Sequence, residues 1–136
     1  MRGSLIVSAL VRNPVTGLEI TVPFRVDGRC EVVPVLLNHS DVITLQLPAA
    51  ESVSVLVKDS STTSTISLLQ AVEVTLTFSD GTVVTGMMNA GCFFPPLHTT
   101  APAVAVVTED ARILGYDALK ILGLKQDYKA RCLTKL

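Results

Sequence analysis

The residues of this chain that could do chemistry gather in one short segment, Asn38-His39-Ser40-Asp41, directly after an apolar run. A histidine beside a serine suggests the base and nucleophile of a serine hydrolase. Neighbouring residues of an extended chain point to opposite faces, so His39 and Ser40 cannot form such a pair within one subunit. We therefore interpret His39, like His98, as a polar residue of an interface or loop.

The cysteines and histidines lack the spacing of a metal site. Cys92 and His98 lie six residues apart with no CxxC or HxxxH pair nearby, which argues against zinc. We expect no metal and no cofactor. Three cysteines cannot all pair within one chain, and the first residues lack a full signal-peptide apolar region, so we expect reduced thiols and an intracellular location, cytoplasmic or nuclear.

Two alternating segments predict two β-hairpins. Residues 18–26 carry apolar side chains at the even positions, which is typical of a half-buried strand. Asp27-Gly28 then predicts a tight turn into a return strand at residues 32–37. Residues 72–78 repeat the alternation and end at Asp80-Gly81 before a second return strand. The similarity of the two units indicates a domain with an internal two-fold.

Between and after these hairpins the sequence predicts a further hairpin, a loop and another strand. The hydroxyl-rich segment Lys58–Thr65 has apolar flanks and predicts a hairpin tip. Residues 93–98 predict a loop that carries apolar side chains, and residues 103–107 predict a buried strand. These segments extend the β character along most of the chain.

The C-terminal part predicts the one helix of the chain. It begins near Tyr116, runs to Leu122 and stops at Gly123, which suits a left-handed cap. Residues 124–136 predict a final strand. A length of 136 residues suits one domain, which we place at residues 5–136, leaving out residues 1–4 as candidate cloning remnants.

This order of elements resembles one subunit of a retropepsin-like aspartic protease. The closest local match is Ile113-Leu114-Gly115-Tyr116-Asp117-Ala118-Leu119, followed by Leu122-Gly123-Leu124 and Asp127-Tyr128. Family members often carry Ile/Leu-Leu-Gly, one residue, Asp, and then a helix that ends in Leu-Gly-Leu. Together with the hairpins, the resemblance covers residues 18–128. It implies a mostly β, closed β-barrel-type domain with one short C-terminal helix.

The resemblance also identifies the positions of the catalytic loop. In the family, the strand after the first hairpin ends in Asp-Thr-Gly or Asp-Ser-Gly. Aligned without a gap, this chain has Asn38, His39 and Ser40 there. Aspartic proteolysis needs two carboxylates that share a proton, and in this family each subunit of a dimer donates one. A neutral amide cannot replace either carboxylate, so we expect no catalytic residues and a pseudoenzyme.

Other carboxylates do not restore the missing pair. Asp27 lies in the predicted hairpin turn. Asp41 comes three residues late, and this odd shift points it to the other face of a strand. Asp117 matches a non-catalytic acid of the family at the helix start, where we expect it to cap the helix.

The resemblance implies a dimerisation or peptide- and protein-binding module. The partner is a second copy or a related chain, with the ends around Leu5–Val11 and Ala130–Leu136 in the interface. An extended peptide or protein ligand would lie in the groove under a flap. The flap residues are Ser60, Ser61, Thr62, Thr63, Ser64 and Thr65. The alternative is an aspartic-type peptidase that uses displaced carboxylates or is completed by an active partner subunit. A third reading is an unrelated small β-barrel.

Charge and hydropathy argue against two classes of partner. The net charge is −1, and the cations are scattered, whereas nucleic-acid binding draws on clustered basic residues. No apolar run approaches the ~18 residues of a spanning helix. We therefore expect neither a nucleic-acid nor a membrane partner.

Overall fold

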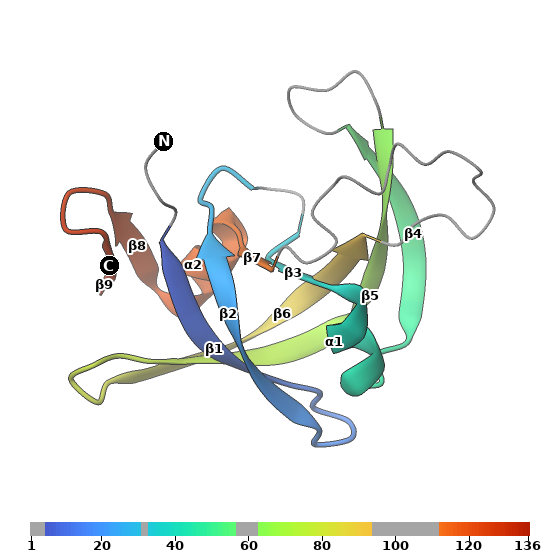
Figure 1. Cartoon of the computed structure of the whole chain (residues 1–136), viewed down its shortest axis with the longest axis horizontal. Coiled ribbons are helices and arrows are strands. Elements are labelled where there is room, and N and C mark those ends of the chain that lie inside the picture. Colours follow the sequence, from blue (N-terminus) through green and yellow to red (C-terminus); the bar gives the residue numbers. More distant parts are fainter. Residues whose placement is uncertain (1–4, 31–32, 57–62, 94–111) are drawn as a thin grey trace.

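The computed structural model describes residues 5–30, 33–56, 63–93 and 112–136 (Figure 1). Strands dominate these ranges, so the prediction of a mostly β fold is confirmed. The strands are β1 (Ile6–Arg12), β2 (Glu19–Val26), β3 (Val35–Leu37), β4 (Ala49–Leu56), β5 (Thr63–Thr77), β6 (Val83–Phe93), β7 (Ile113–Leu114), β8 (Leu124–Asp127) and β9 (Cys132–Lys135), and the helices are α1 (His39–Thr44) and α2 (Tyr116–Leu122).

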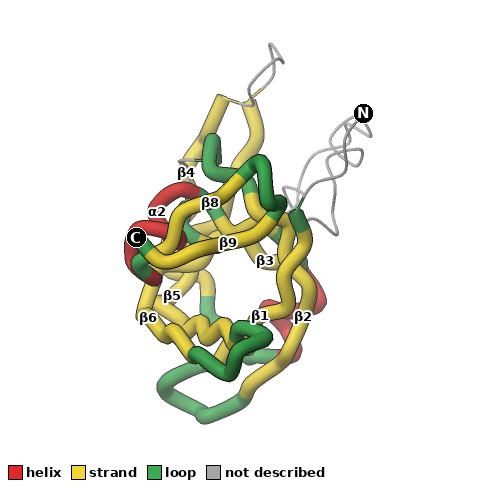
Figure 2. The backbone as a smooth tube through the Cα atoms, turned by 90° about the vertical axis from the view of Figure 1, so that its left-hand side faces the viewer, coloured by secondary structure: helices red, strands yellow, loops and turns green. Residues whose placement is uncertain are grey.

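Seven strands form one sheet in the order β1-β2-β7-β3-β6-β5-β4, and β1 also pairs with β5. The hydrogen bonding therefore returns to the first strand, and β4 remains as an appended edge. Strands β8 and β9 form a separate two-stranded sheet. Figure 1 shows β4 and the start of β5 extending away from the other strands, while Figure 2 shows the β8–β9 hairpin in front of them.

The predicted hairpin between residues 18–26 and 32–37 is wrong. Strand β2 pairs antiparallel with β1, from Ile6 opposite Arg25 to Arg12 opposite Glu19. The short strand β7 then lies between β2, which it meets in parallel, and β3, which it meets antiparallel. Alternation identified β2 correctly as a strand but carried no information about its neighbours. Strand β7, from far along the chain, pairs with the edge of β2 that the return strand after Asp27-Gly28 was expected to occupy.

The second predicted hairpin is confirmed. Strands β5 and β6 pair antiparallel up to Thr77 opposite Val83. In the turn, the N–H of Thr82 donates to Asp80 Oδ1 at 2.9 Å, and Gly81 adopts a φ of 89°. This left-handed conformation is accessible to glycine at no steric cost, which explains the Asp-Gly pair.

Strands β4 and β5 also pair antiparallel, with Leu56 opposite Thr63, which confirms the hairpin predicted around Lys58–Thr65. Its tip, residues 57–62, lies outside the described residues. The same is true of the strand predicted at residues 103–107 and of the loop predicted at residues 93–98, apart from Phe93 at the end of β6.

The C-terminal helix is confirmed as α2, and it ends at Gly123 with a φ of 71°. Its N-cap is Gly115 and no side chain caps it, so the prediction that Asp117 caps the helix is wrong. Asp117 lies two positions after the N-cap and instead places its negative charge in the first turn, where the helix dipole favours it. Two further differences are the unpredicted helix α1 and the presence of two strands, not one, after residue 123.

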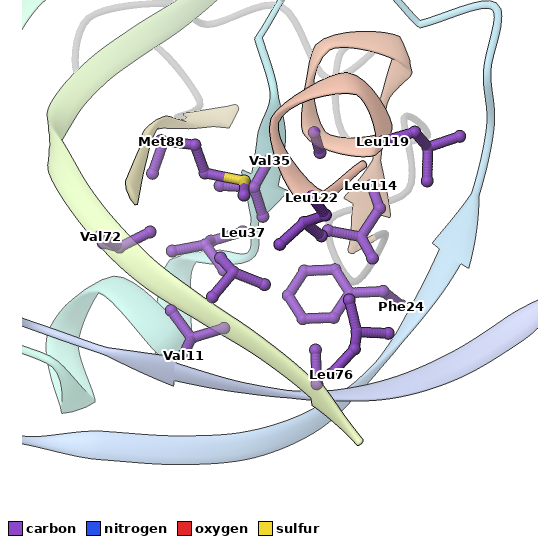
Figure 3. Close-up of a cluster of buried hydrophobic side chains, with 14 of the residues drawn as sticks. Val11, Phe24, Val35, Leu37, Val72, Leu76, Met88, Leu114, Leu119 and Leu122 are labelled. Carbon is purple, nitrogen blue, oxygen red and sulfur yellow. The ribbon is translucent and has the colours of Figure 1, made fainter. Parts of the chain in front are cut away.

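The core consists of the inward-facing side chains of the strands and of the two helices (Figure 3). Phe24 and Val26 of β2 are buried whereas Thr21 and Pro23 are exposed, as the alternation predicts. All three residues of β3 are buried, which is expected of a strand with neighbours on both sides. The largest fully enclosed side chains include Phe24, Leu37, Leu45, Ile66 and Leu114.

Gly115 holds β7 and α2 close to the segment before β3. Its N–H donates to the carbonyl oxygen of Pro34 at 2.8 Å, and the N–H of Tyr116 donates to that of Cys30 at 2.9 Å. A Cβ atom at Gly115 would lie 2.5 Å from the Cys30 oxygen and 3.0 Å from the Val33 oxygen. Only glycine allows this approach, because both obstacles are backbone atoms.

We expect Gly115→Ala to lower the free energy of unfolding by about 1–3 kcal/mol or more, since it forces two backbone segments apart. Urea unfolding of the variant measures the loss. Gly28→Ala is the matched control, because its Cβ would find only the Tyr128 hydroxyl at an ordinary 3.8 Å. Equal stability of the two variants would contradict this account of the close approach.

Candidate functional site

Asn38 leaves strand β3 and begins helix α1. Its backbone is extended, with φ −90° and ψ 171°, and its side chain caps the helix. Asn38 Oδ1 accepts hydrogen bonds from the N–H of Asp41 and the hydroxyl of Ser40, each at 2.9 Å. In return, Asp41 Oδ2 accepts from the N–H of Asn38 at 3.2 Å. This reciprocal arrangement is a capping box, which satisfies donors that a helix start leaves without partners.

The capping box determines which contacts Asn38, His39 and Ser40 can make. Asn38 is only 6% exposed, and its amide oxygen is engaged by two donors. His39 and Ser40 are exposed in the first turn of α1. The prediction of an extended chain is therefore wrong at His39 and Ser40, because the chain turns into a helix directly after Asn38, whose own backbone is still extended. The amide is neutral and offers no group that could take a proton from water near neutral pH.

Asp41 is the carboxylate nearest to Asn38 in the sequence, and it forms an ion pair with Arg112. The guanidinium Nε and Nη2 donate to its two carboxylate oxygens at 2.7 and 3.0 Å. The Asp41 side chain is 4% exposed and that of Arg112 is 20% exposed. The prediction that Asp41 points to the other face of a strand is wrong, because the residue lies in a helix. Arg112 was not among the predicted site residues, because no sequence signal links it to Asp41, which lies 71 residues earlier in the chain.

A buried asparagine ties the end of α1 to two strands. Asn13, 1% exposed, follows β1, and its Nδ2 donates to the carbonyl oxygen of Leu45 at 2.8 Å. Its Oδ1 accepts from the N–H of Val15 and from Nε2 of Gln70, at 3.0 and 2.8 Å. Gln70 lies at a register shift of β5 against β6. Both ends of α1 are thus held by buried asparagine side chains.

The resemblance's second motif lies against the strand that precedes Asn38. Ile113 and Leu114 form β7 and stand opposite Leu36 and Val35 of β3. Gly115 follows as the N-cap of α2. Asp117 is exposed on α2. Asp27 follows β2 and does not lie in a β2–β3 hairpin turn. Its N–H donates to the carbonyl oxygen of Leu114 at 2.9 Å, and its Oδ1 accepts from the N–H of Arg29 at 3.0 Å.

Of the six predicted flap residues, Ser60, Ser61 and Thr62 lie outside the described residues. The other three, Thr63, Ser64 and Thr65, form the start of β5 and pair with β4. Their backbone is therefore part of the β4–β5 hairpin, at the β4 edge of the sheet.

Cys92 lies opposite Leu37 on the parallel neighbour β6 and is fully buried. Burial, and secondarily the negative charge of Asp41, raises the pKa of its thiol to about 12. A thiol with such a pKa is protonated at neutral pH and is a poor nucleophile. All three cysteines are free of disulfides.

The described part of the chain holds no cluster of three or more residues suited to metal binding. In the same ranges, no helix has the length and apolar character needed to cross a membrane.

Comparisons with known proteins do not assign the chain to a family. No protein-family model matches it, and no curated protein is significantly similar to it.

We expect Asp41→Asn to lower the free energy of unfolding by about 3–5 kcal/mol, because it leaves the charge of Arg112 without its partner. The asparagine keeps the acceptor for the Asn38 N–H, so the loss measures the ion pair. Urea unfolding of Asp41→Asn, Arg112→Met and the double variant forms a cycle. If the double variant is as unstable as the sum of the two single changes, the pair is not coupled and this account fails.

We expect Cys92 to resist alkylation in the folded protein up to about pH 9, since its thiol stays protonated there, while half-buried Cys30 and Cys132 react. Mass spectrometry after a timed iodoacetamide pulse measures each site. The pKa is higher in the folded than in the unfolded state, so this thiol's contribution to stability is complete below pH 9 and falls as pH rises towards 12. Rapid labelling of Cys92 at neutral pH in folded protein would contradict its burial.

Proposed function

We propose that this chain is a catalytically inactive retropepsin-like domain that serves as a dimerisation or peptide-binding module. The observation that carries the proposal is the role of Asn38. At the position that the resemblance assigns to the catalytic aspartate, the chain has a buried neutral amide that caps a helix.

The pairing of the strands supports the retropepsin-like reading. The segment Ile113-Leu114-Gly115 packs beside the strand that leads to Asn38, and α2 follows it directly. An unrelated small β-barrel has no reason to place these two segments together. The pairing of β1 with both β2 and β5 is also what a closed barrel-type domain requires.

The contacts of Asp41 argue against a displaced active carboxylate. A general base must reach a water molecule and exchange a proton with it. Both oxygens of Asp41 are already occupied by Arg112, and one also accepts from the backbone of Asn38. This carboxylate could act on water only after a buried ion pair had been broken.

A peptide-binding role is supported by the free edge of β4. In the seven-stranded sheet of the described residues, β4 lies at the edge and pairs with β5 alone. An extended peptide can add to such an edge as a further strand. The terminal strands β1 and β9 are the segments that we propose for the contact with a second copy.

Two outcomes of one experiment separate the binding module from the alternative peptidase. We expect Asn38→Asp to lower the free energy of unfolding at neutral pH, because its charge is buried without a cation of its own beside Asp41, although aspartate is as good an N-cap as asparagine. We also expect it to cleave no peptide, since its carboxylate is engaged by the helix start and Ser40 still follows two positions later. Urea unfolding measures the first outcome, and a peptide-library assay from about pH 3.5 to 7.5 measures the second.

The same assay on the unchanged protein, beside light scattering, tests the proposal as a whole. A dimer without cleavage is the expected result. Cleavage with an acid optimum by the unchanged protein or by Asn38→Asp would support the peptidase, and a pure monomer at high concentration would contradict the dimerisation role. Ser40→Gly combined with Asn38→Asp is a further control, because it restores two of the three family positions.

A further inference from the structure

A pocket of about 290 Å³ lies between the start of β1, the end of β5 and the start of β9. The β8–β9 hairpin forms no strand pairs with the larger sheet, so the space between the hairpin and the sheet is filled by side chains. Figure 1 shows this hairpin beside β1. The pocket's apolar walls are formed by Leu5, Val7, Leu76, Phe78 and Leu133. Of these, Leu76 and Leu133 are buried core residues, which makes the pocket an extension of the core.

The mouth of the pocket is polar and carries one charged lining residue. Ser8, Thr77 and Ser79 contribute hydroxyl groups, and Arg131 contributes the charge. Arg131 takes part in neither of the ion pairs found among the described residues. Its turn is fixed by Asp127, whose Oδ1 accepts from the N–H groups of Lys129 and Ala130 at 3.1 and 2.9 Å. An exposed arginine on a hydrogen-bonded turn is therefore part of the lining of an apolar pocket.

The acidic group closest in sequence to this mouth does not cancel that charge. Asp80 follows Ser79, but its carboxylate accepts a hydrogen bond from Thr82 and interacts with the positive charge of Lys135. The mouth is therefore positive around Arg131. Pockets for small ligands combine apolar walls with few polar groups that orient the ligand, and this volume lies at the small end of their range.

We propose that this pocket binds a free straight-chain carboxylate of medium length, with its alkyl chain against the apolar walls and its carboxylate beside Arg131. Charge complementarity selects an anion, and the shape and apolar character of the walls select an alkyl chain. This site is separate from the Asn38 region, so it does not depend on the proposed loss of proteolysis. It shares β1 and β9 with the contact proposed for a second copy, so the carboxylate and a second copy compete for this face.

The cysteines of the chain provide the readout. Cys132 lines the pocket and is half-buried, whereas Cys30 is half-buried but does not line it. The probe is octanoate, titrated against the full chain while maleimide labelling at each cysteine is followed by mass spectrometry. We expect octanoate to slow labelling at Cys132 saturably and to leave Cys30 unchanged. Decanoate should act at concentrations about sixteenfold lower, since each of its two additional methylenes contributes about fourfold.

Two variants test the role of the charge. Arg131→Gln should abolish the preference for octanoate over the neutral octanol, with protection measured relative to this variant's own Cys132 labelling rate without ligand. Lys129→Gln, on the same turn but outside the pocket, should keep the preference. No saturable protection of Cys132, or equal protection by octanoate and octanol in the unchanged protein, would overturn the proposal. Protection of Cys132 by higher protein concentration alone would also overturn it and would identify a second copy as the occupant.

Discussion

The bidentate ion pair between Asp41 and Arg112 joins the two halves of the chain at the point where the strands β3 and β7 meet. Asp41 belongs to the first turn of α1, and Arg112 directly precedes β7. A charge as deeply buried as that of Asp41 is tolerated only when it is paired and its lone pairs are satisfied. The capping box and the guanidinium together provide four hydrogen bonds around Asn38 and Asp41. The direction in which the chain leaves β3 depends on them.

On the proposed retropepsin-like alignment, Asn38 stands where the family has an aspartate, and these contacts show that it caps a helix there. A catalytic carboxylate has to be accessible to water and close to a second carboxylate. The segment here is built in the opposite way, with an enclosed amide, a helix that begins at once and an arginine that neutralises the neighbouring acid. Such an arrangement stabilises a turn and engages both the Asn38 amide oxygen and the Asp41 carboxylate. On the proposed retropepsin-like alignment, residues at the position of an active loop contribute to the stability of the domain.

The sequence predicted the elements whose signals are local. The alternation of residues 18–26 and 72–78, the Asp80-Gly81 turn and the Gly123 cap each depend on a few neighbouring residues, and the structure has all of them. It could not predict that β7 separates β2 from β3, because pairing between distant strands leaves no periodic trace. Helix α1 did have a signal, an acid three residues after a capping asparagine. The alignment of Asn38 with a strand end obscured it. The link from Asp41 to Arg112 had no signal at all.

The late position of β7 in the sequence has a consequence for the order in which the domain can assemble. β7 consists of Ile113 and Leu114, yet it supplies the neighbour of β2 on one side and of β3 on the other. Until these residues leave the ribosome, both strands present unpaired backbone edges, which invite contacts with other chains. Pairings of such large sequence separation also slow folding. The domain is therefore exposed to aggregation until residues 113 and 114 have been synthesised, because its centre cannot close before then.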